Sequence, residues 1–184
     1  SRKPRPHLLV MTATPIPRTL ALSLYGEFEI STLRSLPKGR KEIQTYWIDQ
    51  EKEKEVLEYI ATRIRETEEQ AYILFPIIDE TQGSDLQAAT QEYERLRNGV
   101  FGNIPVGLLH GRLSKRERDE VMKKFYGCKL KVLVTTSVVE VGVDNPNVTF
   151  MVIEHSERFG LAQLHQMRGR IGRGAYRQGR GIAG

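Results

Sequence analysis

Six short apolar runs alternate with amphipathic segments along the chain, and this alternation most restricts the folds that it can adopt. Each run is continuously apolar, as strands buried on both faces of a parallel sheet require. The runs lie at residues 8–11, 46–48, 72–75, 106–109, 132–134 and 150–153. Strands and helices in repeated succession predict a three-layer α/β fold with a mostly parallel sheet.

Three of the intervening segments have apolar residues at helical spacing, around residues 56–64, 86–96 and 121–125. The third is preceded by Ser114 and, three residues later, Glu117. This spacing is typical of a capping box, in which each side chain accepts a hydrogen bond from a backbone N–H of the other residue. The spacing therefore predicts a helix that begins at Ser114.

One segment, residues 31–42, interrupts the alternation. It has neither helical nor strand periodicity and contains a proline and a glycine, so we expect a linker there. Residues 1–30 hold one predicted strand and one predicted helix, too little to enclose a core, and are expected to be the remnant of a preceding domain. Residues 43–184 would form a second domain. The Gly- and Arg-rich residues 174–184 end abruptly, so we expect the chain to be part of a longer protein.

The basic residues gather at the two ends of the chain, which has 184 residues and a net charge of +5. Residues 1–26 hold four basic residues and residues 158–184 hold six arginines, with no acid in either segment. The middle is left with 18 basic and 23 acidic residues. Basic ends on an acidic body favour contact with a polyanion, although solvated basic tails would give the same pattern.

The composition excludes several classes of protein. With 39% hydrophobic and 28% charged residues and no low-complexity tract, the chain is neither disordered nor collagen-like. No apolar run approaches the roughly 20 residues that span a bilayer, and no signal-type stretch follows the N-terminus, so we expect no membrane partner. A single cysteine, Cys128, fits a cytoplasmic protein, and no Cys–His spacing suggests a metal site.

The strongest candidate for chemistry is the segment Gln166–Arg173. If helical geometry continues through it, Gln166, Arg170 and Arg173 lie on one face and present an amide and two guanidiniums. The planar, permanently charged guanidinium matches phosphate oxygens bidentately. The alternative is a basic helix end that frays into a Gly-rich tail, because arginine is favourable at a helix C-terminus.

A second candidate, residues 12–19, follows the first apolar run. Thr14 can cap a helix and Pro15 can occupy its first position, so free N–H groups and Arg18 gather at a positive helix end. This arrangement favours a phosphate site. An ordinary turn from strand to helix would have the same residues.

The third candidate, residues 134–144, brings hydroxyl groups to the end of a predicted strand. Open α/β sheets bind ligands at this edge, so Thr135 and Thr136 are candidate binding residues. Asp144 could accept from a ribose hydroxyl or orient an arginine. The alternative for Asp144 is a turn over residues 144–147, which have turn-forming composition.

Two features imitate catalytic motifs. Asp79 and Glu80 after an apolar run resemble the acidic Mg²⁺ motif of nucleotide hydrolases, but the chain has no Gly-Lys dipeptide and therefore lacks the phosphate-binding loop. We interpret both as surface acids. His110, at the end of another run, is interpreted as a structural residue.

Taken together and in order, these segments resemble the C-terminal half of a superfamily 2 helicase motor. Residues 11–19 resemble motif III, residues 135–144 resemble motif V, and residues 166–173 match the Q-x-x-G-R-x-G-R form of motif VI. Four further stretches are similar to helicases that act on branched DNA: residues 36–41, 92–96, 106–112 and 158–166. The last of them is shared with Mfd-like transcription-repair coupling translocases, whereas the first two favour the branched-DNA helicases.

The resemblance implies a RecA-like second motor domain, preceded by the tail of a first RecA-like domain. ATP and Mg²⁺ would be held mainly by that first domain, and the two domains would close over the nucleotide. Arg170 and Arg173 would be arginine fingers assisted by Gln166. Gly142 and Asp144 would contact the nucleotide.

The resemblance also implies that Thr14, Arg18, Thr135 and Thr136 face the nucleic-acid backbone or couple it to the nucleotide site. The partner would be branched or double-stranded DNA, at stalled replication forks and recombination intermediates in the bacterial cytoplasm. The alternatives are an Mfd-like translocase of double-stranded DNA and a non-catalytic DNA-binding or interaction module. Because the phosphate-binding lysine and the acidic Mg²⁺ motif are missing, we expect the chain alone to hydrolyse ATP no faster than background.

Overall fold

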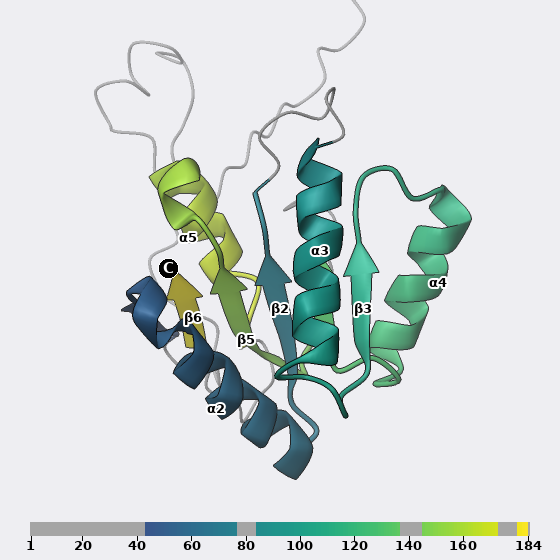
Figure 1. The fold of residues 1–184 in the computed structure, drawn as a ribbon, viewed down its shortest axis with the longest axis horizontal. Helices are drawn as coiled ribbons and strands as arrows, with labels where there is room; N and C mark the ends of the chain where they lie inside the picture. The colour runs from purple at the N-terminus through teal and green to yellow at the C-terminus, as the bar shows by residue number, and fades with distance from the viewer. Residues whose placement is uncertain (1–42, 77–83, 137–144, 173–179, 184) are drawn as a thin grey trace, which may run out of the picture. The chain divides into compact units, whose positions relative to one another are not determined.

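A computed structural model describes residues 43–76, 84–136, 145–172 and 180–183, which lie in the second of the chain's two units, Leu36–Gly184 (Figure 1). The predicted remnant at 1–30 and the predicted linker lie outside these residues. The elements, in order, are β1 (Gln44–Trp47), η1 (Gln50–Lys52), α2 (Glu53–Glu66), β2 (Gln70–Leu74), α3 (Ser84–Asn98), β3 (Val106–Leu109), α4 (Lys115–Tyr126), β4 (Val132–Thr135), β5 (Val148–Ile153), η2 (Ser156–Arg158), α5 (Leu161–Arg168) and β6 (Arg180–Ala183).

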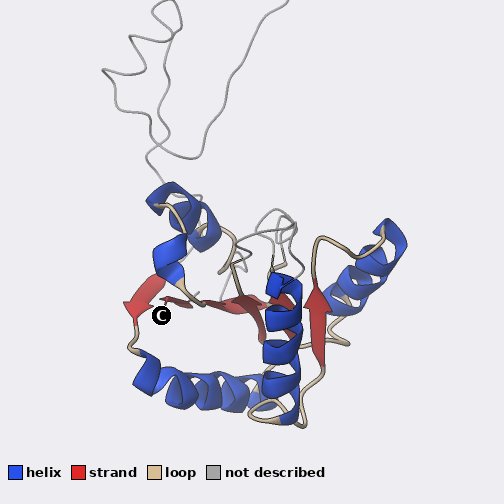
Figure 2. Ribbon diagram, turned by 45° about the horizontal axis from the view of Figure 1, so that its top comes forward, coloured by secondary structure: helices blue, strands red, loops and turns tan. Residues whose placement is uncertain are grey.

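The described strands form one parallel sheet of six, in the order β1-β6-β5-β2-β4-β3. Alternate residues of the central strand β2 point to opposite faces. Ala71 and Ile73 belong to the core beneath α2 and α3, whereas Tyr72 and Leu74 belong to the core beneath α4 and α5. Helices therefore cover both faces of the sheet (Figure 2). The expected three-layer parallel α/β fold is confirmed.

The helix α2 shows how an amphipathic segment packs against the sheet. Leu57, Ile60, Ala61 and Ile64 recur at helical spacing, and all four are buried against the sheet. The first turn carries acidic residues and the last turn basic ones, which complements the helix dipole at both ends.

The helix α4 begins as its sequence predicts. The backbone N–H of Ser114 donates to Oε2 of Glu117 over 2.9 Å, and the backbone N–H of Glu117 donates to the hydroxyl oxygen of Ser114 over 3.3 Å. Both halves of the capping box are therefore present. Phe125, fully buried, fixes the other end of the helix to the sheet.

The strand β6 was not predicted, because it lies in the Gly- and Arg-rich segment that has no apolar run. It lies between β1 and β5, pairing Gly181 with both Thr45 and Met151. Backbone hydrogen bonds need no particular side chain, so a segment of this composition can complete a parallel sheet. The strand thus lies inside the predicted second domain, residues 43–184.

A buried hydrogen-bond network ties the amino ends of the strands together. The Nε2 atom of Gln70 donates to the carbonyl oxygens of Phe125 and Leu130, both over 2.7 Å, and its Oε1 accepts from Nδ2 of Asn145 over 3.1 Å. The backbone N–H of Asn147 donates to Oδ1 of Asn145 over 3.0 Å, which forms a turn. A turn is therefore present at residues 145–147, with Asn145 as its side-chain acceptor, while Asp144 lies outside the described residues.

Candidate functional site

The carboxyl ends of the parallel strands meet at one edge of the sheet, and several candidate residues lie along it. Thr135 ends β4, between Leu74 of β2 and Leu109 of β3. Its carbonyl oxygen accepts from the backbone N–H of Phe75 over 2.9 Å, while the N–H of Thr136 donates to the carbonyl of Leu109 over 3.2 Å. The two threonines thus extend the hydrogen-bonded ladder to the edge where open α/β sheets bind ligands.

Thr135 and Thr136 are both buried, whereas a residue that contacts DNA or nucleotide at the surface would be exposed. Thr135 is 0% exposed and Thr136 is 6% exposed. The hydroxyl of Thr136 has no hydrogen-bond partner in the described part of the chain.

The helix α5 carries Gln166 and ends two residues before Arg170. The N–H of Gly160 donates to Oε1 of Gln163 over 2.9 Å at its start. At its end, the N–H of Arg170 donates to the carbonyl of Met167 over 2.9 Å, a tighter turn than that of an α-helix. Met167 and Ile171, 1% and 0% exposed, anchor this segment to the sheet.

The condition for a shared helical face of Gln166, Arg170 and Arg173, helical geometry through the whole segment, is not met, and Arg173 lies outside the described residues. The helix stops at Arg168, and Gly172 has φ of 66°, a left-handed conformation that no α-helix contains. Two glycines in four residues leave the backbone free to make this turn. Gln166 is exposed and Arg170 is half-buried, so the turn rather than a helical face sets where each side chain points.

Arg170 lies near the sheet face that α4 and α5 cover. Burial raises the pKa of Tyr72 on β2, the neighbouring Tyr126 raises it further, and the positive charge of Arg170 opposes them. The side chain of Arg170 takes part in no ion pair or hydrogen bond within the described segments. It therefore has donors to offer to an anion.

The remaining predicted site residues lie outside the described ranges. They are Thr14, Arg18, Gly142, Asp144 and Arg173. Asp79 and Glu80, interpreted as surface acids, also lie outside them. Their assignments stay predictions.

A second cluster, which we call the acidic cavity, was not predicted. It is a cavity of about 520 Å³ on the α2 and α3 side of the carboxyl edge, and its charged lining includes Glu53, Glu92, Arg95 and Glu154. Arg95 donates from Nη2 to Oε1 of Glu53 and from Nε to Oε2 of Glu92, each over 2.6 Å. These two carboxylates outweigh the effect of burial and raise the pKa of Arg95.

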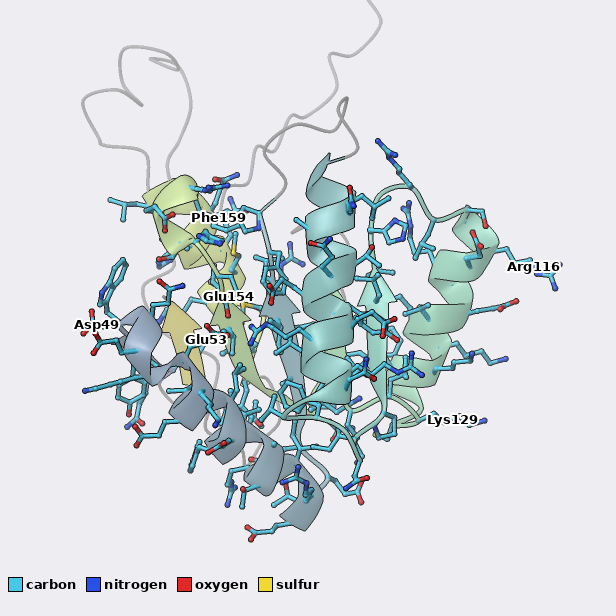
Figure 3. The ribbon with its side chains drawn as sticks, in the orientation of Figure 1. Asp49, Glu53, Arg116, Lys129, Glu154 and Phe159 are labelled. Carbon is cyan, nitrogen blue, oxygen red and sulfur yellow. The ribbon has the colours of Figure 1, made fainter. Side chains whose placement is uncertain are left out.

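Glu154, directly after β5, lies beside Glu53 in this cavity (Figure 3). The pKa of Glu154 is raised to about 7, mainly by burial. The charges of Glu53 and Glu92 also raise this pKa, whereas the charge of Arg95 lowers it. The one signal for this cavity in the sequence was an acidic residue, Glu154, directly after the apolar run 150–153. The other three residues come from helices about 40 positions apart, a separation that no local pattern spans.

Among the residues that the structure describes, no group of three or more His, Cys, Asp or Glu side chains could hold a metal ion. Cys128 is a free, half-buried thiol, and Nδ2 of Asn147 lies 3.3 Å from its Sγ. None of the described helices is both long enough and apolar enough to cross a membrane.

Residues 51–175 match the family described as helicase conserved C-terminal domain. The chain is 47% identical over 171 residues to the ATP-dependent DNA helicase RecG of Synechocystis sp., covering 93% of this chain and 20% of that protein. It is 46% identical over 171 residues to RecG of Bacillus subtilis, covering 93% of this chain and 25% of that protein. The chain thus spans about a fifth to a quarter of the length of these curated relatives.

Solved structures give a matching result. A structure of RecG bound to a three-way DNA junction superposes with a TM-score of 0.73 at 42% identity, covering 93% of this chain and 22% of that one. Domain 2 of the DEAD-box helicase Mss116p, bound to an RNA duplex, superposes with a TM-score of 0.60 at 22% identity over 76% of this chain and 53% of that one. The second likeness is one of fold alone.

Proposed function

The chain belongs to the helicase conserved C-terminal domain family, and we propose that it is the second motor domain of an ATP-dependent DNA helicase that acts on branched DNA. The support is its 46–47% identity to RecG helicases over 93% of its length. The structural likeness to a RecG bound to a three-way junction favours branched DNA over unbranched duplex. The helicase would remodel stalled replication forks and recombination intermediates in DNA repair.

The observation that carries the proposal is the environment of Arg170. Its guanidinium is half-buried after α5, and no carboxylate of the described residues neutralises it. A cation in such a place fits the phosphates of ATP, because the guanidinium offers several N–H donors in one plane. Phosphoryl transfer needs charge stabilisation more than covalent help, and an arginine finger contributes roughly 10³–10⁵ in rate.

Other residues would complete the nucleotide site. Arg173 would supply a second finger, and the exposed amide of Gln166 would assist by hydrogen bonding to the phosphates or the attacking water. Gly142 and Asp144 would contact the nucleotide, Asp144 through the ribose or a finger arginine. ATP, when bound with Mg²⁺, supplies the phosphoryl group, and the first motor domain of the same polypeptide would hold most of it.

The contacts with DNA would be made mainly to its phosphate backbone. Thr14, Arg18, Thr135 and Thr136 are the proposed residues. The burial of Thr135 and Thr136 supports a role in coupling the DNA site to the nucleotide site more than one in direct contact. Backbone contacts carry no sequence information, so we expect little discrimination between bases.

The chain alone would hydrolyse ATP no faster than background, because its sequence has no phosphate-binding lysine loop. Closure of the two motor domains would bring Arg170 to the phosphates only during turnover. A DNA-stimulated ATPase activity that survives active-site controls in the isolated chain would contradict this part of the proposal.

The experiment that tests the proposal uses the full-length protein with Arg170→Ala. DNA-stimulated ATP turnover should fall by about 10³ or more, while fork-DNA affinity changes by less than about threefold. Lys54→Ala, at an exposed position on α2, is the matched control. Turnover that is unchanged in Arg170→Ala would assign this arginine to the fold or to DNA, and Arg173→Ala applies the same test to the second finger.

A further inference from the structure

One hydrogen bond joins the end of α5 to the beginning of the described domain. The guanidinium of Arg168 donates from Nη2 to the carbonyl oxygen of Ile43 over 3.0 Å, across 125 positions of sequence. Arg168 and the residues from Ile43 to Tyr46 line a hollow on the surface. The contact is therefore made beside the edge strand β1.

Ile43 is held there by its side chain as well. It is 8% exposed and belongs to the same core cluster as Met167 and Ile171, the two residues that anchor the α5 segment. The carbonyl of Ile43 thus contacts this segment directly, and its side chain is buried in the same core cluster.

The two partners occupy special places in the chain. Ile43 directly follows the predicted linker at 31–42, and Arg168 precedes the candidate finger Arg170 by two residues. The hydrogen bond therefore joins the beginning of the described domain to the turn that carries the candidate finger.

We propose that Arg168 is a positioning residue that holds the turn carrying the candidate arginine finger Arg170 through its hydrogen bond to the carbonyl of Ile43. The proposal rests on the proposed function. The Arg168 contact holds the end of α5 against Ile43 and so sets the place of the turn at Gly169 and Arg170. Arg168 itself touches neither nucleotide nor DNA.

Arginine is suited to this role. Its five N–H donors lie on a planar head at the end of a long stem, so it can reach a backbone carbonyl on another element and still remain solvated. A cation at the end of α5 would also be favourable to the helix dipole, which lysine satisfies equally well. A comparison of lysine with an uncharged residue at position 168 separates the two effects.

The experiment uses the full-length protein and three variants. Arg168→Met keeps the stem and removes every donor, Arg168→Lys keeps the charge and one donor group, and Lys54→Met is the control at an exposed helix position. Amide hydrogen exchange over residues 43–47 reports the contact itself, and DNA-stimulated turnover with varied ATP reports kcat and KM.

We expect Arg168→Met to speed exchange at residues 43–47 and to lower kcat, each by roughly 3- to 30-fold, as for mutations that alter coupling between sites. KM for ATP and fork affinity should stay within about twofold, since the residue does not contact either ligand. Arg168→Lys should restore part of kcat, and Lys54→Met should change nothing. In the double variant with Ile43→Ala, kcat should fall no further than in the more affected single variant.

Three results would overturn the proposal. Unchanged exchange in Arg168→Met means that the contact does not hold Ile43. Faster exchange with unchanged kcat means that the contact is structural only, and a raised KM at constant kcat means that Arg168 binds substrate. If Arg168→Met does not fold, Arg168→Lys is judged by the same exchange and kcat criteria. A wild-type protein without DNA-stimulated turnover contradicts the proposed function and the positioning role together, whereas the exchange result still reports the contact.

Discussion

Arg95 of α3 donates to the carboxylate of Glu53 on α2 over 2.6 Å, so one ion pair joins the two helices on this face of the sheet. The same guanidinium binds Glu92, also over 2.6 Å. The two arginines of the same cavity pair with other carboxylates, Arg95 with Glu53 and Glu92 and Arg158 with Glu157. The cavity therefore favours the neutral form of Glu154.

The free energy of unfolding should fall with rising pH because of Glu154. Its pKa is raised to about 7 in the folded protein, from an ordinary 4.5, so the folded state binds the proton more tightly than the unfolded state does. The resulting stabilisation is full below about pH 4.5 and is lost as the pH rises through about 7. Urea unfolding at pH 5 and pH 8 should show Glu154→Gln gaining about 1–3 kcal/mol over wild type at the higher pH. Equal gains at both values, or a similar gain in the exposed control Glu58→Gln, would contradict this explanation.

Replacement of Arg95 should make that pH dependence stronger. The positive charge of Arg95 lowers the pKa of Glu154, so Arg95→Met should raise it and extend the loss of stability to higher pH. The loss of two partly exposed ion pairs should also cost about 1 kcal/mol at neutral pH. Unfolding measured from pH 5 to pH 9 tests both effects. Arg97→Met, on the same helix, removes a 3.8 Å pair with Glu94 and a cation–π contact with Tyr93, neither of which involves Glu154, and should leave the pH profile unchanged.

Tyr72→Phe should stabilise the protein. The Tyr72 ring packs against Phe125 at a centroid distance of 5.2 Å, but its buried hydroxyl has no hydrogen-bond partner in the described part of the chain. Removing an unsatisfied buried hydroxyl should raise the free energy of unfolding by up to about 1 kcal/mol. Tyr93→Phe, which loses a 3.5 Å contact with the carbonyl of Val106, should show no gain. A clear loss of stability in Tyr72→Phe would mean that this hydroxyl is bonded in solution.

Gln70→Leu should be among the more damaging core substitutions. It removes the side-chain partner of the Leu130 carbonyl and of the Asn145 amide, and one donor to the Phe125 carbonyl, which still accepts from the N–H of Cys128. We expect a loss of about 2–4 kcal/mol in chemical unfolding, since each orphaned buried polar group carries a desolvation cost. Gln91→Leu, a change of the same kind on α3, is the control. A loss below that of the control would show that water replaces the missing bonds.

The affinity of the full-length protein for fork DNA should depend strongly on salt. Phosphate contacts release counterions, so we expect at least a tenfold loss of affinity between about 50 and 200 mM salt. Binding isotherms at four salt concentrations would give the slope. An affinity that barely changes over this range would argue against contacts dominated by phosphate.

The strands that the sequence predicts are those with a purely local signal. Parallel strands buried on both faces must be continuously apolar, and the runs at 72–75, 106–109, 132–134 and 150–153 all lie within or overlap observed strands. The strand β6 has no such signal, because its place depends on backbone pairing with β1 and β5. The end of α5 was also missed, since the periodic pattern does not show that Gly172 reverses the backbone.

The candidate site residues also divide into those that a local motif shows and those that only the fold brings together. Gln166 and Arg170 stand in a contiguous motif, so their residue types and spacing are visible in the sequence. The acidic cavity combines Glu53, Arg95 and Glu154 from three elements, which only the fold brings together. The contact of Arg168 with Ile43 is harder still to predict, because its acceptor is a backbone carbonyl that any residue would supply.

The pairing of β1 with β6 has a consequence for how the protein forms during synthesis. The strand β1 pairs with β6 and with no other described strand, and β6 lies more than 130 residues later in the chain. The strands β2 to β5 pair with one another and can assemble as soon as residue 153 has left the ribosome. The first of the described strands to be made is therefore the last to be paired. A ribosome that stalls before residue 180 leaves β1, with the exposed ring of Trp47, open to pairing with other chains.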